Sequence, residues 1–279
     1  DGDIACHCVG PLRRYSPIVL LPLPNRTSYT RPMTQITAEM VGQVQIIRFN
    51  RPEKMNAITR DMYAELARLL TEANGDFSIR AVVLSSVGDH FTAGNDIMDF
   101  MNNPPTSEDS TVAAFLGSLL NFTKPLLAAV RGHAVGVGTT MLLHCDVVVA
   151  SDTAKFSMPF TSLGLVPEAG SSMLFPALVG HQRAAKIFLT GEEFSPAYAQ
   201  EIGLVAEIAP DSEAAAIAIA TTIAEQPPQA VLNTKALMKA SRHDAVEAVM
   251  KAEFQIFSLA LQSEEFADAV MKKMSQKGK

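Results

Sequence analysis

The residue best suited to acid–base chemistry is Glu168, which lies in an apolar and glycine-containing stretch between residues 156 and 172. A carboxylate among such neighbours is desolvated on folding, and desolvation raises its pKa towards neutrality. A carboxylate of this kind is an effective general base near neutral pH. Alternatively, Glu168 caps a helix that Ala169 and Gly170 open, because acidic residues are common in the first turn of helices. The local sequence leaves both roles open.

Two glycine-containing turns are candidates for binding a developing negative charge. Residues 91–96 follow a buried strand, and residues 131–140 follow another strand and open a helix. Glycine permits sharp turns and close approach to a ligand, and a helix N-terminus presents unpaired N–H groups. Each turn is able to aim one N–H at an oxyanion, although such turns also serve packing alone. Neither the phosphate-loop pattern nor the dinucleotide pattern is present, since Met141 replaces the third glycine of the latter.

Alternating strands and helices are predicted around these candidates. Wholly apolar runs of strand length predict strands buried on both faces at residues 81–84, 126–130 and 147–150. One further strand is expected over residues 41–49. Apolar residues at helical spacing, the first set preceded by Thr59 as N-cap, predict helices at residues 59–75, 112–122 and 137–144. Buried strands linked by helices indicate an α/β core.

The two ends of the chain differ from this core. Residues 1–32 hold five prolines, and we expect Met33 to be the natural start, with residues 1–32 an upstream or leader extension or, alternatively, an ordered arm. Residues 33–226 form the predicted core, and residues 227–279 form a helical C-terminal region. The elements expected after the core strands are helices at 196–202, 211–225, 227–240 and 244–261 and a strand at 204–208.

Composition excludes several classes of protein. The chain of 279 residues, 48% of them hydrophobic, is long enough for a globular core. A net charge of −6 without a basic field argues against a nucleic-acid partner. No apolar run approaches the ~18–20 residues of a membrane-spanning helix, so no membrane partner is expected. Cys6, Cys8 and Cys145 form no disulfide framework, and no metal is expected because Cys6-His7-Cys8 lacks further ligands.

The motifs, taken together in their order and spacing, resemble the crotonase superfamily of enoyl-CoA hydratases and isomerases. The stretches that carry the resemblance are residues 50–57 (NRPEKMNA), the two glycine-containing turns, Cys145-Asp146, Thr190-Gly191 and Gly203-Leu204-Val205. The resemblance covers about residues 37–274 and excludes residues 1–32. It implies a spiral core of ββα turns with a helical C-terminal oligomerisation region, assembled as a homotrimer or hexamer.

The resemblance also implies a substrate and the residues that bind it. Members of the family bind acyl-CoA thioesters and hold the thioester enolate with two backbone N–H groups, which here are those of Asn95 and Val137. The residues expected to line the acyl-CoA groove are Ala93, Gly94, Asn95, Asp96, Ile97, Gly136 and Val137, with Ala57 near the adenine. No cofactor is expected, because coenzyme A is part of the substrate.

Several nearby residues also have structural explanations. His133 and His144 are expected to pack or to cap a helix rather than to catalyse. Asp96 is expected to hold its loop through backbone hydrogen bonds. Met98, Phe100 and Met101 are candidates for lining an acyl pocket, with core packing as the alternative.

Departures from the hydratase pattern indicate one subgroup of the family. Hydratases use two glutamates, at positions where this chain has Thr140 and Phe160. Glu168 falls instead where the peroxisomal-type delta(3)-delta(2)-enoyl-CoA isomerases have their single catalytic glutamate. The resemblance therefore implies an enzyme that shifts the double bond of a 3-enoyl-CoA to the 2-trans position, as in fatty-acid oxidation.

Two other functions stay open at the level of sequence. One is enoyl-CoA hydration with a displaced acid, or another crotonase-type reaction. The other is a non-catalytic acyl-CoA-binding scaffold, since a fold alone does not guarantee chemistry. Residues 276–279 are not the Ser-Lys-Leu peroxisomal signal, so a cytoplasmic location is expected.

Overall fold

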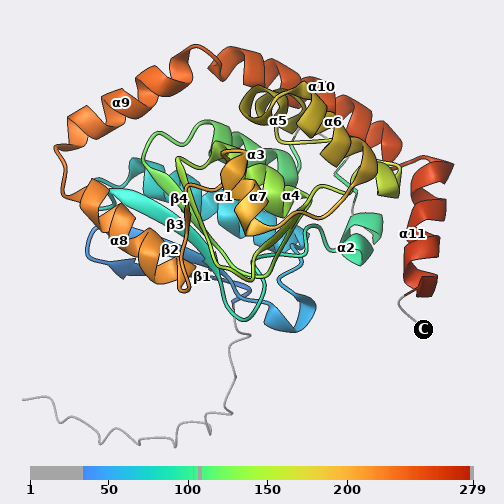
Figure 1. Cartoon of the computed structure of the whole chain (residues 1–279), viewed down its shortest axis with the longest axis horizontal. Helices are drawn as coiled ribbons and strands as arrows, with labels where there is room; N and C mark the ends of the chain where they lie inside the picture. Colours follow the sequence, from blue (N-terminus) through green and yellow to red (C-terminus); the bar gives the residue numbers. More distant parts are fainter. Residues whose placement is uncertain (1–33, 103, 106–108, 277–279) are drawn as a thin grey trace, which may run out of the picture. The chain divides into compact units, whose positions relative to one another are not determined.

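A six-stranded sheet lies at the centre of the computed structural model, which describes residues 34–102, 104–105 and 109–276 (Figure 1). The expectations for residues 1–32 therefore lie outside the described residues. The strands, in sheet order, are β1 Ile36–Val41, β2 Val44–Phe49, β3 Ala81–Ser86, β4 Leu126–Val130, β6 Val147–Ala150 and β8 Glu207–Ile208. β1 pairs antiparallel with β2, and the other neighbours pair in parallel. A separate small parallel pair consists of β5 His133–Val135 and β7 Lys155–Ser157.

The first edge of the sheet is a hairpin. The strand predicted over residues 41–49 is confirmed as β2, Val44–Phe49, whereas β1 before it had no predicted range. The chain reverses at Gly42, whose φ of +57° favours glycine. β1 and β2 then pair from Ile36 opposite Phe49 to Val41 opposite Val44. Strand-forming residues on both sides of Gly42 conceal this turn in the sequence.

The strands predicted at residues 81–84, 126–130 and 147–150 are confirmed as the middle of the sheet. Every residue of β3 and β4 is buried, because helices cover both faces. α8 Ser212–Ala224 packs on one face through Ala216 and Ala220. On the other face, α1 Arg60–Gly75 and α3 Thr111–Leu120 share a core cluster with alternate residues of β3 and β4.

The predicted helices of the core are confirmed with small shifts at their ends. Thr59 caps α1 by accepting a hydrogen bond from the Met62 N–H. The helix expected at 137–144 is α4, Val137–Thr140, followed by the 3-10 turn η2, Met141–His144. α7 spans Pro196–Glu201, and the strand expected at 204–208 is reduced to β8. The helices without a predicted range are α2 Ile97–Asn102, α5 Ser171–Val179, α6 His181–Thr190 and α11 Glu264–Gln276.

The C-terminal region is helical, as the sequence predicts. It consists of α9 Pro228–Ala240, α10 His243–Ala260 and α11. Figure 1 shows these helices along the outside of the core, with α10 against α5. α11 contacts the 3-10 turn η3, Thr161–Leu163. No helix in the described ranges is long and apolar enough to cross a lipid bilayer.

Candidate active site

The two glycine-containing turns lie side by side in the structure. The Thr92 N–H donates to the His133 carbonyl at 2.9 Å, and the Val135 N–H donates to the Thr92 carbonyl at 3.0 Å. These bonds pair Thr92 with Ala134 in a parallel bridge. Because the paired segments run in parallel, the residues that follow Thr92 and Val135 leave the bridge in the same direction.

Glycine precedes each of the two predicted N–H donors for a geometric reason. Gly94 has a φ of +82°, and a Cβ there would lie 2.6 Å from the Val135 carbonyl oxygen. Gly136 has a φ of +58° and leads into α4, whose first residue is Val137. In the described part of the chain, neither the Asn95 N–H nor the Val137 N–H has an acceptor. Two unpaired donors therefore follow the two glycines, as an anion site requires.

A pocket, here called the amide pocket, contains most of the predicted binding residues. Those in its lining are Ala93, Gly94, Asn95, Ile97, Gly136 and Val137, joined by Phe100, Val135, Pro159, Phe160, Leu163, Leu165, Phe257, Phe266 and Lys273. Phe160, which occupies one of the two hydratase acid positions, is a buried apolar part of the wall. The pocket therefore combines backbone donors with a mainly apolar surface.

Asp96 and Ala57, the other predicted binding residues, are joined by Arg51 outside this lining. Arg51 Nη1 donates to Asp96 Oδ2 at 2.6 Å and to the Ala57 carbonyl at 3.0 Å. Asp96 Oδ1 accepts from the N–H groups of Met98 and Asp99 at the start of α2. Burial acts to raise the pKa of Asp96, but the bonds from Arg51 and the two N–H groups outweigh burial and lower it. The structure confirms that Asp96 holds its loop through backbone hydrogen bonds.

Glu168 is buried, with 8% of its surface exposed. Thr140 Oγ1 donates a hydrogen bond of 2.5 Å to Glu168 Oε1. The other hydratase acid position, Thr140, thus holds a hydroxyl that supports the carboxylate. Burial raises the pKa of Glu168 to about 8, opposed by the Thr140 hydrogen bond and assisted by the negative charge of Glu253. The predicted desolvation of Glu168 is confirmed.

The alternative role of Glu168 as a helix cap is wrong. α5 begins two residues beyond Ala169, at Ser171. The carboxylate at its N-terminus is that of Glu253 from α10, which accepts from the Gly170 N–H at 2.6 Å and from the Ser172 N–H at 2.8 Å. Glu168 is left to face a pocket.

This second pocket, here called the carboxylate pocket, adjoins the amide pocket. Its lining consists of Tyr63, Asn95, Phe100, Pro105, Val112, Leu116, Glu168, Ala169, Met250, Phe254 and Phe257. Asn95, Phe100 and Phe257 line both pockets, so the pockets are neighbours. Tyr63 donates its hydroxyl to Asn95 Oδ1, and burial raises the pKa of Tyr63 well above its ordinary value. Among the acyl-pocket candidates Phe100 lines both pockets, whereas Met98 is 53% exposed.

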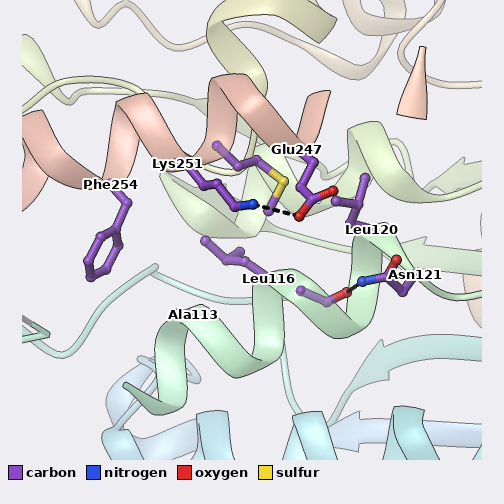
Figure 2. A pocket seen from close by; sticks show the side chains of 9 residues that line it. Ala113, Leu116, Leu120, Asn121, Glu247, Lys251 and Phe254 are labelled. Atoms are coloured by element: carbon purple, nitrogen blue, oxygen red, sulfur yellow. Dashed lines mark hydrogen bonds and ion pairs between the residues drawn. The ribbon is translucent and has the colours of Figure 1, made fainter. Parts of the chain in front are cut away.

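An apolar groove continues from the carboxylate pocket between α3 and α10 (Figure 2). Its lining consists of Ala113, Leu116, Gly117, Leu120, Asn121, Glu247, Met250, Lys251 and Phe254. Leu116, Met250 and Phe254 line both the carboxylate pocket and the groove, so the groove begins beside the buried carboxylate. Figure 2 shows the groove's ion pair, Lys251 Nζ to Glu247 Oε1 at 2.8 Å.

The two histidines near the turns have different surroundings. His144 is buried and donates its Nε2–H to the Ala169 carbonyl at 2.7 Å. Burial lowers the pKa of His144 to about 4, so the ring is neutral and serves packing and hydrogen bonding as predicted. His133 lies 3.5 Å from the partly exposed Glu193.

In the described ranges no three His, Cys, Asp or Glu side chains are grouped to hold a metal ion, and Cys6-His7-Cys8 lies outside them.

Comparison with known families identifies the class of protein. The chain matches the family described as Enoyl-CoA hydratase/isomerase over residues 39–277. This match covers most of the chain, so the chain belongs to the enoyl-CoA hydratase/isomerase family and thus to the crotonase superfamily. It is an enzyme family that acts on acyl-CoA thioesters.

Individual relatives include both isomerases and hydratases. The chain is 34% identical over 252 residues to Enoyl-CoA delta isomerase 2 of Rattus norvegicus. The aligned region covers 88% of this chain and 64% of the rat protein. It is 31% identical to the 2,3-dehydroadipyl-CoA hydratase of Escherichia coli, over 84% of this chain and 92% of that enzyme. The chain therefore spans less than two thirds of the rat isomerase, and the relatives alone do not decide between the two reactions.

Solved structures confirm the crotonase fold. Pseudomonas aeruginosa OdaA superposes with a TM-score of 0.85 at 40% identity, covering 86% of this chain and 99% of that chain. An enoyl-CoA hydratase/isomerase from Pseudoalteromonas atlantica T6c has a TM-score of 0.84, also at 40% identity, with coverage of 87% and 97%. The predicted α/β crotonase-type core and its helical C-terminal region are therefore established.

Proposed function

We propose that the protein is an enoyl-CoA isomerase that converts 3-enoyl-CoA into 2-trans-enoyl-CoA. The observation that carries this proposal is one buried carboxylate, Glu168, in a pocket that shares Asn95 with the amide pocket. Among the described residues that line these two pockets, Glu168 is the sole acidic side chain. Isomerisation needs one group that first takes and then returns a proton, and a single carboxylate meets that need.

The proposed reaction moves one proton along the substrate. The ionised Glu168 carboxylate removes a proton from C2 of the 3-enoyl thioester, and the electron pair delocalises to the thioester oxygen as a dienolate. The Asn95 and Val137 N–H groups donate to that oxygen, each such donor contributing about 3 kcal/mol to transition-state stabilisation. Glu168 then returns the proton at C4, and the double bond lies between C2 and C3. Atoms and charge balance without a cofactor.

The neighbouring groups have defined parts in this proposal. Thr140 fixes one oxygen of Glu168 through its 2.5 Å hydrogen bond, which leaves the other oxygen for the substrate. Tyr63 holds the Asn95 side chain on the border of the two pockets. The aliphatic end of the acyl chain passes Leu116 and enters the groove between α3 and α10, where apolar side chains remove it from water.

Hydration is the second candidate because hydratases are among the relatives. It requires a base that activates water and an acid that protonates carbon, and Thr140 and Phe160 supply neither. The test is product analysis with the purified enzyme. 3-Hexenoyl-CoA should be converted into 2-trans-hexenoyl-CoA, whereas crotonyl-CoA should give little 3-hydroxybutyryl-CoA. Efficient hydration of crotonyl-CoA without isomerisation would replace this proposal by the second candidate.

We also propose that the enzyme assembles as a homotrimer or hexamer through its C-terminal helices. Large apolar side chains on these helices are exposed in the single chain, among them Leu237 at 77% on α9 and Leu259 at 71% on α10. Burying such side chains in an interface is favourable. Light scattering at micromolar concentration should give a trimer or a hexamer, and a monomer would exclude this part of the proposal.

A further inference from the structure

The chain turns sharply directly after Glu168. Ala169 has a φ of +62° and Gly170 a φ of +72°, so two successive residues adopt the left-handed conformation. For alanine this conformation costs roughly 1–2 kcal/mol. A strained turn persists only where the surrounding contacts enforce it. The contacts to this turn therefore decide where the Glu168 carboxylate lies.

Two side chains from different elements hold the turn. His144 of η2 donates to the Ala169 carbonyl at 2.7 Å. Glu253 of α10 accepts from the Gly170 N–H at 2.6 Å and from the Ser172 N–H at 2.8 Å. α10 also packs directly on the turn, since a Cβ at Gly170 would lie 2.9 Å from Val246 Cγ1. The turn is thus fixed to η2, which precedes it in the sequence, and to α10, which follows it.

The position of Glu253 requires a carboxylate. Its surface is 6% exposed, and its two oxygens each accept one backbone N–H at the start of α5. The N-terminus of a helix carries unpaired N–H groups and a partial positive charge, which favour an anion there. A glutamine has one acceptor oxygen, so its NH2 group would face the second N–H. The proposed reaction gives this buried carboxylate no step of its own.

We propose that Glu253 is a positioning residue for Glu168: it ties α10 to the strained turn and thereby fixes the carboxylate that transfers the proton. The inference rests on the proposed isomerase function. It explains why a helix of the C-terminal region carries a buried acid that touches neither the amide pocket nor the carboxylate pocket in the described structure.

The charge of Glu253 also affects the ionisation of Glu168. Its negative charge adds to the desolvation that raises the pKa of Glu168. The other titratable groups around the turn are Tyr63 of α1, whose pKa is raised by burial, and the neutral His144 of η2. The cations Lys235, Lys239 and Arg242 act on His144. Neutralising Glu253 should therefore lower the pKa of Glu168.

The test compares Glu253→Gln with the wild type as a function of pH, using 3-hexenoyl-CoA. In the wild type kcat should fall as pH drops below about 8, because Glu168 becomes protonated. In Glu253→Gln the acid limb should move to lower pH, because the negative charge that adds to the desolvation of Glu168 is removed. The kcat plateau should fall about tenfold because the base is misplaced, while KM stays within about twofold.

Two further variants separate the effect of the Glu253 charge from that of its side-chain length and from loss of a charge elsewhere on α10. Glu253→Asp keeps the charge but shortens the side chain, so its kcat plateau should fall while its acid limb stays at the wild-type pH. Asp244→Asn neutralises an exposed carboxylate on the same helix and should leave both quantities unchanged. An acid limb that stays in place in Glu253→Gln, or a plateau equal to that of the wild type, would overturn the inference.

A measurement without substrate separates this inference from the proposed function. The carboxyl carbons of glutamate, labelled with 13C, report the titration of Glu168 by NMR in the wild type and in Glu253→Gln. A lower pKa in the variant supports the inference even if the wild type fails to isomerise 3-hexenoyl-CoA, which would reject the function alone. An unchanged pKa in an active enzyme rejects the inference and leaves the function standing.

Discussion

The amide pocket and the carboxylate pocket share Asn95, yet different parts of the chain assemble them. The donors of the amide pocket are backbone N–H groups, placed by two paired turns of the α/β core. The carboxylate pocket depends on a side chain, Glu168, which is held by the Thr140 hydroxyl. The turn that carries Glu168 is held by Glu253 from the C-terminal helices.

This difference predicts two kinds of sensitivity to substitution. A backbone donor is lost only when its N–H is removed, so the amide pocket should tolerate most changes of side chain. A side-chain base depends on its own identity and on every group that fixes or charges it. Catalysis that depends on the carboxylate pocket should therefore also respond to substitution of residues outside both pockets. Glu253 is one such residue.

The largest effect is expected for Glu168, the proposed base. Glu168→Gln keeps the shape of the side chain and removes its basicity, so kcat should fall about 10²–10⁴-fold, the range for loss of a general base. KM should change little, because both N–H donors remain. Steady-state kinetics on 3-hexenoyl-CoA checks this, with the exposed Glu225→Gln as a control that should keep full activity. Wild-type turnover by Glu168→Gln would place the base elsewhere.

The next effect is expected for a backbone donor. Val137 is the first residue of α4, a position that accepts proline without loss of an intrahelical bond. Val137→Pro should therefore fold, lose one N–H donor, and lower kcat about 10²–10³-fold. Val137→Ala keeps the N–H and serves as the matched control, with activity close to that of the wild type. A folded and fully active Val137→Pro would refute the role of this N–H.

A smaller effect is expected in the apolar groove and only for long substrates. Leu116→Trp would fill the junction between the carboxylate pocket and the groove. Losing the groove removes about 0.8 kcal/mol for each CH2 that it buries, so kcat/KM should fall more than about tenfold for a dodecenoyl substrate. The kcat/KM for the shorter 3-hexenoyl-CoA should change little. Equal losses of kcat/KM for both substrates would contradict the placement of the acyl chain in the groove.

The buried base should also reduce stability at alkaline pH. The pKa of Glu168 is about 8 in the folded chain and 4.5 ordinarily, so between these values the folded chain holds a proton that the unfolded chain has lost. The free energy of unfolding should therefore fall as pH rises from about 4.5 to about 8, by an amount on the order of a few kcal/mol. Urea unfolding of Glu168→Gln should show less of this decrease and greater stability than the wild type at pH 9. The same pH dependence in both proteins would contradict the burial of a titrating Glu168.

The smallest effect on activity is expected for the Asn95 side chain. Asn95→Ala keeps the backbone N–H, so kcat should fall far less than in Val137→Pro. The variant leaves the buried Tyr63 hydroxyl without its acceptor, which costs about 1–3 kcal/mol of stability. Tyr63→Phe with Asn95→Ala removes both partners and should recover part of that loss in urea unfolding. A loss of activity as large as that of Val137→Pro would show that the Asn95 side chain takes part in the reaction.

The residues of the amide pocket were predicted through the resemblance to the crotonase superfamily, whereas the local signals mark only the two turns and their strands. Gly94 and Gly136 precede the donors by one residue, and short apolar runs mark the strands that bring the turns together. Helices α6 and α11 were not predicted although both are amphipathic, with Ala184, Ile187 and Phe188 buried on one face of α6. The hairpin around Gly42, the short helix α2 and helix α5 with its internal Pro176 carry weaker local signals. Tertiary packing decides such segments.

In the carboxylate pocket Glu168, Asn95 and Phe100 were predicted, but the contacts that hold the turn after Glu168 were not. Gly170 and Glu253 are 83 residues apart, and no local pattern joins them. The available signal was the position of Glu253 among Val246, Met250 and Phe257, which share the inward face of α10. A carboxylate on an apolar face must find hydrogen-bond donors when buried, but the sequence does not say which donors.

The most direct test of the central claim follows the proton that Glu168 is proposed to transfer. 3-Hexenoyl-CoA deuterated at C2 is converted by the wild-type enzyme in ordinary water, and the 2-trans-hexenoyl-CoA product is analysed by NMR. Because Glu168 is 8% exposed, exchange of its proton with water should be slow relative to transfer. The account predicts deuterium at C4 of the product. A product whose C4 carries hydrogen from water alone would contradict transfer by a single buried carboxylate.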